Sequence, residues 1–155
     1  METKAIMNNK INIFKEIVRF EDVDAASIVH HPVYLKYLER ARTQSLLDKN
    51  CGIKELIKHK IGIVIASVEM KFIRPLELDD TIYIASQVDQ FNKSIVHMTQ
   101  IIVRDSNNLP KGNLKQELHS IQNLYFFAHL KLALISLETK KLIPAPYWFS
   151  QALLS

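Results

Sequence analysis

The chain has 155 residues, of which 48% are hydrophobic and 23% are charged, a composition typical of one folded domain and not of a disordered chain. The formal net charge of +4 is too small to predict nucleic-acid binding, because lysines and arginines are scattered along the sequence. The single cysteine, Cys51, excludes an intrachain disulfide and a cysteine-rich zinc site. No apolar stretch reaches the roughly 20 residues of a membrane span, and residues 1–10 lack the pattern of a signal peptide, so we expect a cytoplasmic protein.

The first predicted element is a strand over Ile11–Phe20, where Ile, Val and Phe alternate loosely with polar residues. After His31 and Pro32 the hydrophobic period becomes helical, and a long amphipathic helix is predicted. Its apolar face comprises Tyr34, Tyr37, Leu38, Ala41 and Ser45.

Pro32 suits the first turn of this helix, where its missing N–H costs nothing, and Asn50 and Gly52 mark the end. A shorter helix is expected around Ile53–His59. Its basic residues are interpreted as a solvated helix face, with an anionic ligand such as a nucleotide phosphate as the alternative. They are Lys54, Lys58, His59 and Lys60.

The remainder is predicted to be largely β. Three strands are expected over Val64–Ile73, Thr81–Asp89 and Ile95–Val103, with turns at Leu78–Asp80 and Phe91–Lys93. Leu124–Leu137 is apolar at nearly every position, which is typical of a central strand covered on both faces.

The intervening stretch Asp105–Asn123 is polar and weakly helical from Leu114 to Ile121, and we interpret it as a loop or extended hairpin tip. The predicted class is α+β, with a single helix against an antiparallel sheet. Because one helix covers only one face, the other face or the sheet edge is expected to meet a partner subunit.

The candidate site is the polar stretch Glu21–Pro32, which contains two aspartates and two adjacent histidines ahead of the long helix. A helix N-terminus presents unpaired N–H groups and a partial positive charge, which can polarise a carbonyl and hold an oxyanion. A carboxylate just upstream can attack that carbon or activate water. Spacing alone leaves open that Asp22 and Asp24 are only turn and capping residues and that His30 and His31 are a surface pair.

No metal site is expected, because adjacent histidines on a helix face apart and no other pair has ligand spacing. The three glycines, Gly52, Gly62 and Gly112, form no phosphate-binding loop, and no serine-centred nucleophile elbow is present.

The loop and helix also resemble a known family. The stretches Phe20–Ala26, Ile28–Pro32 and Tyr34–Arg42 look like the signature of the 4-hydroxybenzoyl-CoA thioesterase family, which includes the Tol–Pal-associated acyl-CoA thioesterases. The strand and turn Phe72–Asp80 are also similar to that family, and the resemblance covers roughly Ile13–Val103, with a weaker match over Phe127–Pro144.

The resemblance implies a hotdog fold, a curved antiparallel sheet wrapped around one long helix, and a single domain over residues 1–155 with an atypical insertion at about 105–123. It implies hydrolysis of an acyl-CoA to a free acid and CoA, with CoA as part of the substrate and no other cofactor. Asp24 takes the position of the nucleophile or general base, and the backbone N–H of His31 that of the group polarising the carbonyl. The His31 side chain is a further candidate, whereas Asp22 is expected to shape the loop. A homodimer or homotetramer is implied, with active sites between subunits.

Two departures from the family stand out. Ser27 occupies a position where the family has glycine, which suggests positive φ or close approach of substrate, and the segment Asp105–Asn123 replaces a short turn. CoA-contacting residues and acyl preference are not fixed by the resemblance.

Three alternatives to an acyl-CoA thioesterase remain. The first is a thioesterase acting on acyl carrier protein. The second is a hotdog dehydratase, which the His31–Pro32 pair suggests only weakly, because its His-Phe-Pro-Gly pattern is missing. The third is a non-catalytic hotdog binding or scaffold protein, which Ser27 favours.

Overall fold

The computed structural model describes residues 4–5 and 10–155. The expectation drawn from residues 1–10 therefore concerns a stretch that lies mostly outside the described residues. The strands are β1 (Lys4–Ala5), β2 (Asn12–Ile17), β3 (Ile61–Phe72), β4 (Thr81–Asn92), β5 (Ile95–Val103) and β6 (Leu124–Ser136). The α-helices are α1 (His31–Asp48), α2 (Ile53–Lys58), α3 (Leu114–Glu117) and α4 (Tyr147–Leu154), and the 3-10 helices are η1 (Phe20–Asp22), η2 (Ser106–Asn108) and η3 (Leu118–Ser120).

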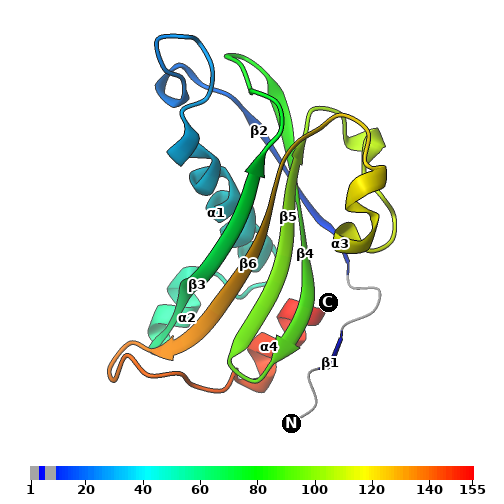
Figure 1. Ribbon diagram of the computed structural model, residues 1–155. Coiled ribbons are helices and arrows are strands. Elements are labelled where there is room, and N and C mark those ends of the chain that lie inside the picture. Colours follow the sequence, from blue (N-terminus) through cyan, green and yellow to red (C-terminus); the bar gives the residue numbers. More distant parts are fainter. Residues whose placement is uncertain (1–3, 6–9) are drawn as a thin grey trace.

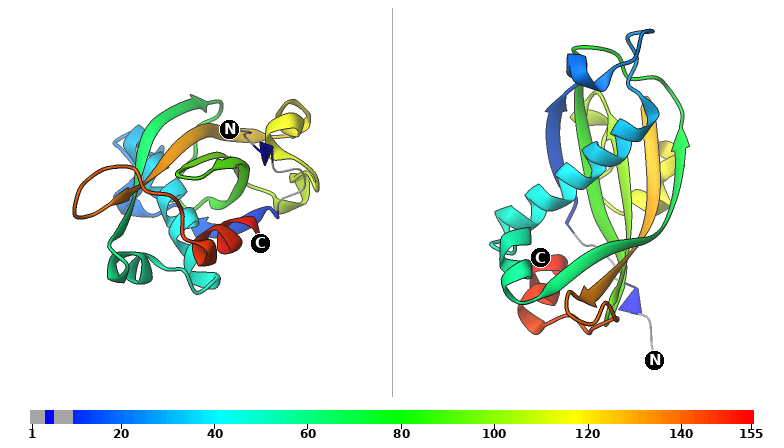
Figure 2. Two further views of the ribbon diagram at one scale, coloured as in Figure 1. Left: turned by 90° about the horizontal axis from the view of Figure 1, so that it is seen from below. Right: turned by 90° about the vertical axis from the view of Figure 1, so that its left-hand side faces the viewer.

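The strands form one antiparallel sheet in the order β1-β4-β5-β6-β3, and β2 also pairs with β4, on the side that β1 occupies further along (Figure 1). The register shifts between Ile65 and Ser67 in β3 and between Val88 and Gln90 in β4. Such irregularities bend a strand and increase its twist. The sheet is accordingly curved, as the two views in Figure 2 show.

Helix α1 lies along one face of this sheet, which we call the inner face (Figure 2). Tyr37 and Leu38 on its packing side are fully buried, and they belong to the same core as Ile84 and Phe126 from the strands. Burying one such side chain contributes roughly 1.5–3 kcal/mol. The long helix, the antiparallel sheet and their contact face agree with the arrangement that the sequence resemblance implied.

The segment 105–123 lies against the opposite, outer face, where it forms a second, smaller core with the sheet (Figure 1, yellow). Leu114 and Leu118 of this segment are buried beside Ala85 and Ile101. The side chain of Gln87 accepts a hydrogen bond from the Leu114 N–H at 2.7 Å and donates one to the Gly112 carbonyl at 3.1 Å. The segment is therefore a folded and docked element. Its description as an insertion in a single domain of residues 1–155 stays a prediction.

Several expectations need correction. The long helix α1, the short helix α2 and the helical piece within 105–123 were predicted, but α4 and β1 were not. The tight turn predicted at Phe91–Lys93 lies at Lys93–Ser94. Strand β4 continues to Asn92, and Phe91 packs against the core. The strand predicted over Leu124–Leu137 is β6, and it lies inside the sheet between β5 and β3. The large exposed apolar side chains of the sheet lie on β2 and β3: Ile13, Ile17, Val64, Ile65 and Phe72.

Cys51 and the basic residues around α2 have simple structural explanations. Cys51 is 5% exposed, and burial raises the pKa of its thiol, so it is a packing residue and not a reactive thiolate. The basic residues of and after α2 all point to solvent: Lys54, Lys58, His59 and Lys60. In the described part of the chain, no helix has both the length and the apolar character needed to cross a membrane.

Candidate active site

The loop between η1 and α1 is a closed turn. Val23 and Val29 form a β-bridge across it. Inside the turn, the Asp24 N–H donates to the Ile28 carbonyl at 3.0 Å, and the Ser27 N–H donates to the Asp24 carbonyl at 3.0 Å. These bonds fix the backbone of Asp24 at one end of the turn, while the other end leads directly into α1.

The same turn is attached to the connection between β3 and β4. The Val29 N–H donates to the Leu76 carbonyl at 2.8 Å, and Ile28 forms a β-bridge with Glu77. The Leu78 N–H closes the contact by donating to the Ser27 carbonyl at 3.3 Å. The connection between β3 and β4 therefore fixes the loop by backbone contacts. The loop has little freedom to move relative to α1.

The side chain of Asp24 is exposed to solvent. Its Oδ1 accepts a 2.8 Å hydrogen bond from the Ala26 N–H, which orients the carboxylate. Its Oδ2 makes no hydrogen bond to any residue that the structure describes. One oxygen of this carboxylate is therefore held by the turn, and the other faces solvent.

His31 is the first residue of α1, and Pro32 is the second. The N–H groups of a first helical turn have no intrahelical acceptor and carry the positive end of the helix dipole. The preceding residue, His30, provides no side-chain cap, and the first turn contains no acidic side chain that would neutralise this charge. The His31 N–H has no hydrogen-bond acceptor among the residues that the structure describes.

The imidazole rings of His30 and His31 are both exposed and meet edge to face, with ring centroids 4.7 Å apart. A role for the His31 side chain stays a prediction. Among the described residues, no group of three or more His, Cys, Asp or Glu side chains is arranged to hold a metal ion.

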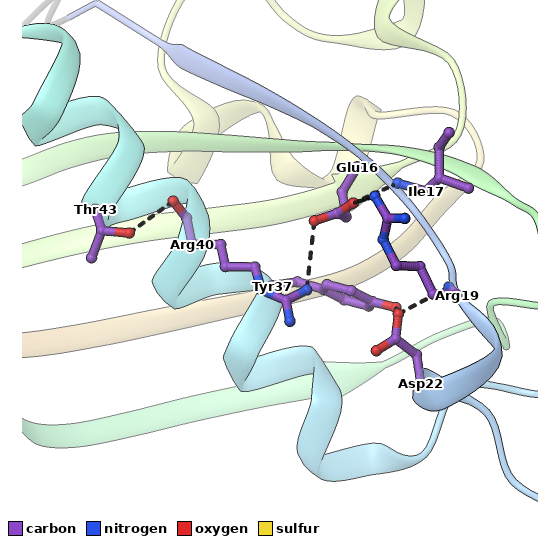
Figure 3. A network of polar contacts seen from close by, with 7 residues as sticks. All are labelled: Glu16, Ile17, Arg19, Asp22, Tyr37, Arg40 and Thr43. Atoms are coloured by element: carbon purple, nitrogen blue, oxygen red, sulfur yellow. Dashed lines mark hydrogen bonds and ion pairs between the residues drawn. The ribbon is translucent and has the colours of Figure 1, made fainter.

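Asp22 differs from Asp24 because it is only 4% exposed. Its Oδ2 accepts hydrogen bonds from the Arg19 N–H at 3.0 Å and from the Tyr37 hydroxyl at 2.8 Å (Figure 3). Its carbonyl accepts from the His30 N–H at 2.9 Å. Burial and the neighbouring Asp22 raise the pKa of the Tyr37 phenol, so it remains a donor at neutral pH. These contacts agree with the expectation that Asp22 shapes the loop.

An ion-pair network borders this loop. Glu16 on β2 lies 3.6 Å from the Arg19 guanidinium and 3.5 Å from that of Arg40 on α1 (Figure 3). Because the Arg19 and Arg40 side chains are 63% and 40% exposed to water, each pair contributes little stability. The network links β2, the start of the loop and α1 through Glu16.

Ser27 adopts φ of 60°, the left-handed conformation that glycine adopts without strain. The family preference for glycine at this position thus has a backbone cause, and Ser27 takes the same conformation with its side chain exposed.

Sequence reasoning missed the support that Tyr37 gives to the loop, because the two partners stand 15 positions apart. The available signal was the hydroxyl of Tyr37 on the face of the predicted helix that packs on the sheet, since a buried Tyr hydroxyl needs a partner.

The comparisons with known proteins agree with one another. A sequence profile described as the thioesterase-like superfamily matches residues 18–153. The acyl-CoA thioester hydrolase YbgC of Escherichia coli O6:H1 is 28% identical over 103 residues, which cover 66% of this chain and 77% of that protein. The acyl-CoA thioesterase YbgC of Helicobacter pylori (strain 26695) is 27% identical over 139 residues, which cover 88% and 95%.

Solved structures show the same fold. A 1,4-dihydroxy-2-naphthoyl-CoA thioesterase from Synechocystis superposes with a TM-score of 0.76 at 16% identity, covering 93% of this chain and 96% of that one. The chain therefore belongs to the thioesterase-like superfamily and has the hotdog fold.

Proposed function

We propose that this protein is an acyl-CoA thioesterase that uses Asp24 and the N-terminus of α1. The class of thioester hydrolase follows from its membership of the family, and the acyl-CoA substrate is the one named for its YbgC relatives. The observation that carries the proposal is the arrangement around one closed turn. The exposed Asp24 carboxylate, with a free Oδ2, stands at one end, and the uncapped helix N-terminus at His31 stands at the other.

The thioester carbonyl oxygen binds at the His31 N–H. As the carbonyl carbon is attacked, negative charge develops on this oxygen, and the N–H and the helix dipole stabilise it. The turn is already fixed by backbone hydrogen bonds, so the donor needs no rearrangement during the reaction.

Two roles of Asp24 fit this geometry. As a general base, Oδ2 takes a proton from water, the water oxygen bonds to the carbonyl carbon, and the C–S bond breaks to release CoA thiolate, which is then protonated. As a nucleophile, Oδ2 bonds to the carbonyl carbon and expels the thiolate, and water then hydrolyses the mixed anhydride. Both give the free acid and CoA. Hydrolysis in ¹⁸O-labelled water under single turnover separates them, because only the anhydride route can place ¹⁸O in Asp24.

We also propose a homodimer or homotetramer. Support comes from β3, an edge strand with exposed apolar side chains: Val64, Ile65 and Phe72 are 40%, 45% and 47% exposed. Exposed apolar residues along a free strand edge favour association. Light scattering at micromolar concentration should give at least twice the monomer mass, and a stable monomer would contradict this assembly.

The central test is Asp24→Asn. The amide keeps the size of the side chain and can still accept from Ala26, but it can neither take a proton nor attack. We expect kcat to fall at least ~100-fold, the scale of losing a general base, with KM little changed. The matched variant is Asp22→Asn, which should lower the melting temperature and reduce kcat far less. Near wild-type activity of a folded Asp24→Asn protein would place the chemistry elsewhere.

The same assay separates the alternatives. An acyl-CoA and an acyl carrier protein that carry the same acyl group are compared by kcat/KM. A higher kcat/KM for the carrier protein would assign that protein as the substrate in place of acyl-CoA. A screen across short, long and aromatic acyl-CoAs that finds no hydrolysis would favour a non-catalytic binding protein.

A further inference from the structure

A pocket of ≈ 180 Å³ lies at the end of α1 far from His31. It is enclosed by the second half of α1, the inner face of the sheet and the C-terminal helix α4, which Figure 2 shows beside the end of α1. Its wall is largely apolar and includes Leu46, Val96, Met98, Leu132 and Phe149. Ile53 and Ile65, which also line it, are 41% and 45% exposed, so the pocket opens to solvent between α2 and β3.

One wall of this pocket carries a guanidinium with an unusual environment. Arg42 on α1 is largely buried, and its Nη1 donates a 2.8 Å hydrogen bond to Oε1 of Gln100. Gln100 is fully buried, and its amide is fixed by donating to the Leu38 carbonyl at 3.0 Å and to the Ser86 hydroxyl at 2.8 Å. Gln100 therefore presents its oxygen to Arg42 and holds the guanidinium in place.

Arg42 has no carboxylate within 4.0 Å among the residues that the structure describes, although Arg19, Arg40 and Arg104 each have one. Glu39, which also lines the pocket, acts on Arg42 only from a longer distance, and burial lowers the pKa of the guanidinium. Arginine has five N–H donors. An arginine removed from water without an anionic partner is costly, so the site suits a ligand that brings a carboxylate.

We propose that this pocket binds a medium-length alkyl carboxylate, with the chain in the apolar part and the carboxylate on Arg42. Arg matches a carboxylate through two parallel N–H···O bonds. Lys49 at the pocket adds a second cation. An apolar cavity of about 150 Å³ holds a benzene molecule, so the volume corresponds to a chain of roughly six to eight carbons.

This site is distinct from the helix N-terminus of the same chain. Arg42 follows His31 by 11 residues, about 16 Å along the helix axis. Fully buried Tyr37 and Leu38 fill the core between them. The inference rests on the proposed function in one respect: the ligand would be the acid that hydrolysis releases. Binding of a carboxylate to the pocket does not itself require hydrolysis.

The test is titration calorimetry of the full chain with octanoate, octanol, octylamine and acetate. Saturable octanoate binding is expected, at least tenfold tighter than octanol and acetate, with no binding of octylamine. Asp24→Asn should bind octanoate as the wild type does. The binding test therefore does not depend on whether Asp24 carries out hydrolysis. Arg42→Met should weaken the binding of octanoate at least tenfold. The matched variant Arg40→Met, two residues earlier on α1 at an arginine paired with Glu16, should leave octanoate binding unchanged.

Two further variants protect the test against misfolding of Arg42→Met. Arg42→Lys keeps a cation but loses the planar fork, and Leu132→Phe fills the pocket without touching the charge. Both variants should weaken the binding of octanoate. The melting temperature of each variant without ligand shows whether it is folded. Equal affinities for octanoate and octanol, an unchanged affinity in the Arg42 variants, or no binding of octanoate to the wild type would each overturn the proposal.

Discussion

The Tyr37 hydroxyl donates a 2.8 Å hydrogen bond to Oδ2 of Asp22, and this contact joins the buried face of α1 to the loop that carries Asp24. Tyr37 is fully buried and Asp22 nearly so. The bond is charge-assisted and shielded from water, which makes it stronger than a neutral one at the surface.

Removing this hydroxyl should loosen the loop. Tyr37→Phe keeps the ring but leaves a buried carboxylate oxygen with one donor fewer, so we expect a loss of about 1–3 kcal/mol in the free energy of unfolding. Because the loop positions Asp24, kcat should also fall several-fold. Urea unfolding and steady-state hydrolysis measure the two effects. Tyr147→Phe, at a tyrosine that is 78% exposed, is the control and should change neither.

Ser27 already adopts the left-handed backbone that the family's glycine would adopt. Ser27→Gly should therefore leave the turn intact and change turnover by less than about tenfold, or ~1.4 kcal/mol in the barrier. Ser27→Val should be poorly tolerated, because a β-branched residue resists positive φ. A gain well above tenfold in the glycine variant would mean that the natural protein is a weakened enzyme.

The segment 105–123 should contribute stability and not chemistry. Val103 and Leu124 are cross-strand partners, so a two-residue Asn-Gly turn in place of residues 104–123 can join β5 to β6. The shortened protein should keep its kcat but expose Ala85 and Ile101 on the outer face, so it should be less stable and less soluble.

A single substitution tests the same point more gently. Leu114→Ala should cost about 2–4 kcal/mol in the free energy of unfolding, because Leu114 is fully buried, with kcat unchanged. Lys115→Ala, at an exposed neighbour, should cost far less. If the shortened protein stayed folded but lost hydrolysis, the segment would be a substrate-binding arm.

The sequence predicted elements whose apolar residues repeat over a long stretch. The helical period after Pro32 gave α1, and the alternation around Ile82 and Ile84 gave β4, because burial on one face imposes those periods. Helix α4 was missed because its eight residues make only about two turns, too few for a helical period to stand out. Its place is set by Phe149 packing on the core, a tertiary contact that local sequence does not encode.

The candidate site was only partly readable for the same reason. The two aspartates of the loop look alike in sequence, and what separates them is burial: Asp22 receives a hydroxyl from a distant turn of α1, whereas Asp24 faces water. The pocket around Arg42 was not foreseen, since its walls come from α1, α2, α4 and five strands. Such a site depends on the packing of elements that periodicity predicts only one at a time.

Asp89 on β4 offers a test by pH. On the outer face its Oδ2 accepts from the Thr99 hydroxyl at 2.8 Å, while its buried Oδ1 has no partner among the described residues. Burial raises the pKa of this carboxyl, although His97 on β5, His129 on β6 and Lys115 on α3 oppose the shift. A raised folded-state pKa means that the ionised carboxylate destabilises the fold at neutral pH. This penalty disappears as the pH falls through the folded-state pKa towards the ordinary range of an aspartate, about 3.9.

Asp89→Asn removes the buried charge and retains an oxygen that can accept from Thr99. The variant should therefore exceed the wild type in the free energy of unfolding at pH 7, by roughly 1 kcal/mol or less, and the advantage should shrink as the pH approaches 4. Urea denaturation at several pH values measures the difference. Asp79→Asn is the control, because Asp79 is exposed and its positive φ of 69° suits asparagine equally well, and it should show no such trend. If Asp89→Asn were less stable than the wild type at pH 7, the hydrogen bond from Thr99 and the attraction of the neighbouring basic side chains would outweigh the cost of burying the charge of Asp89.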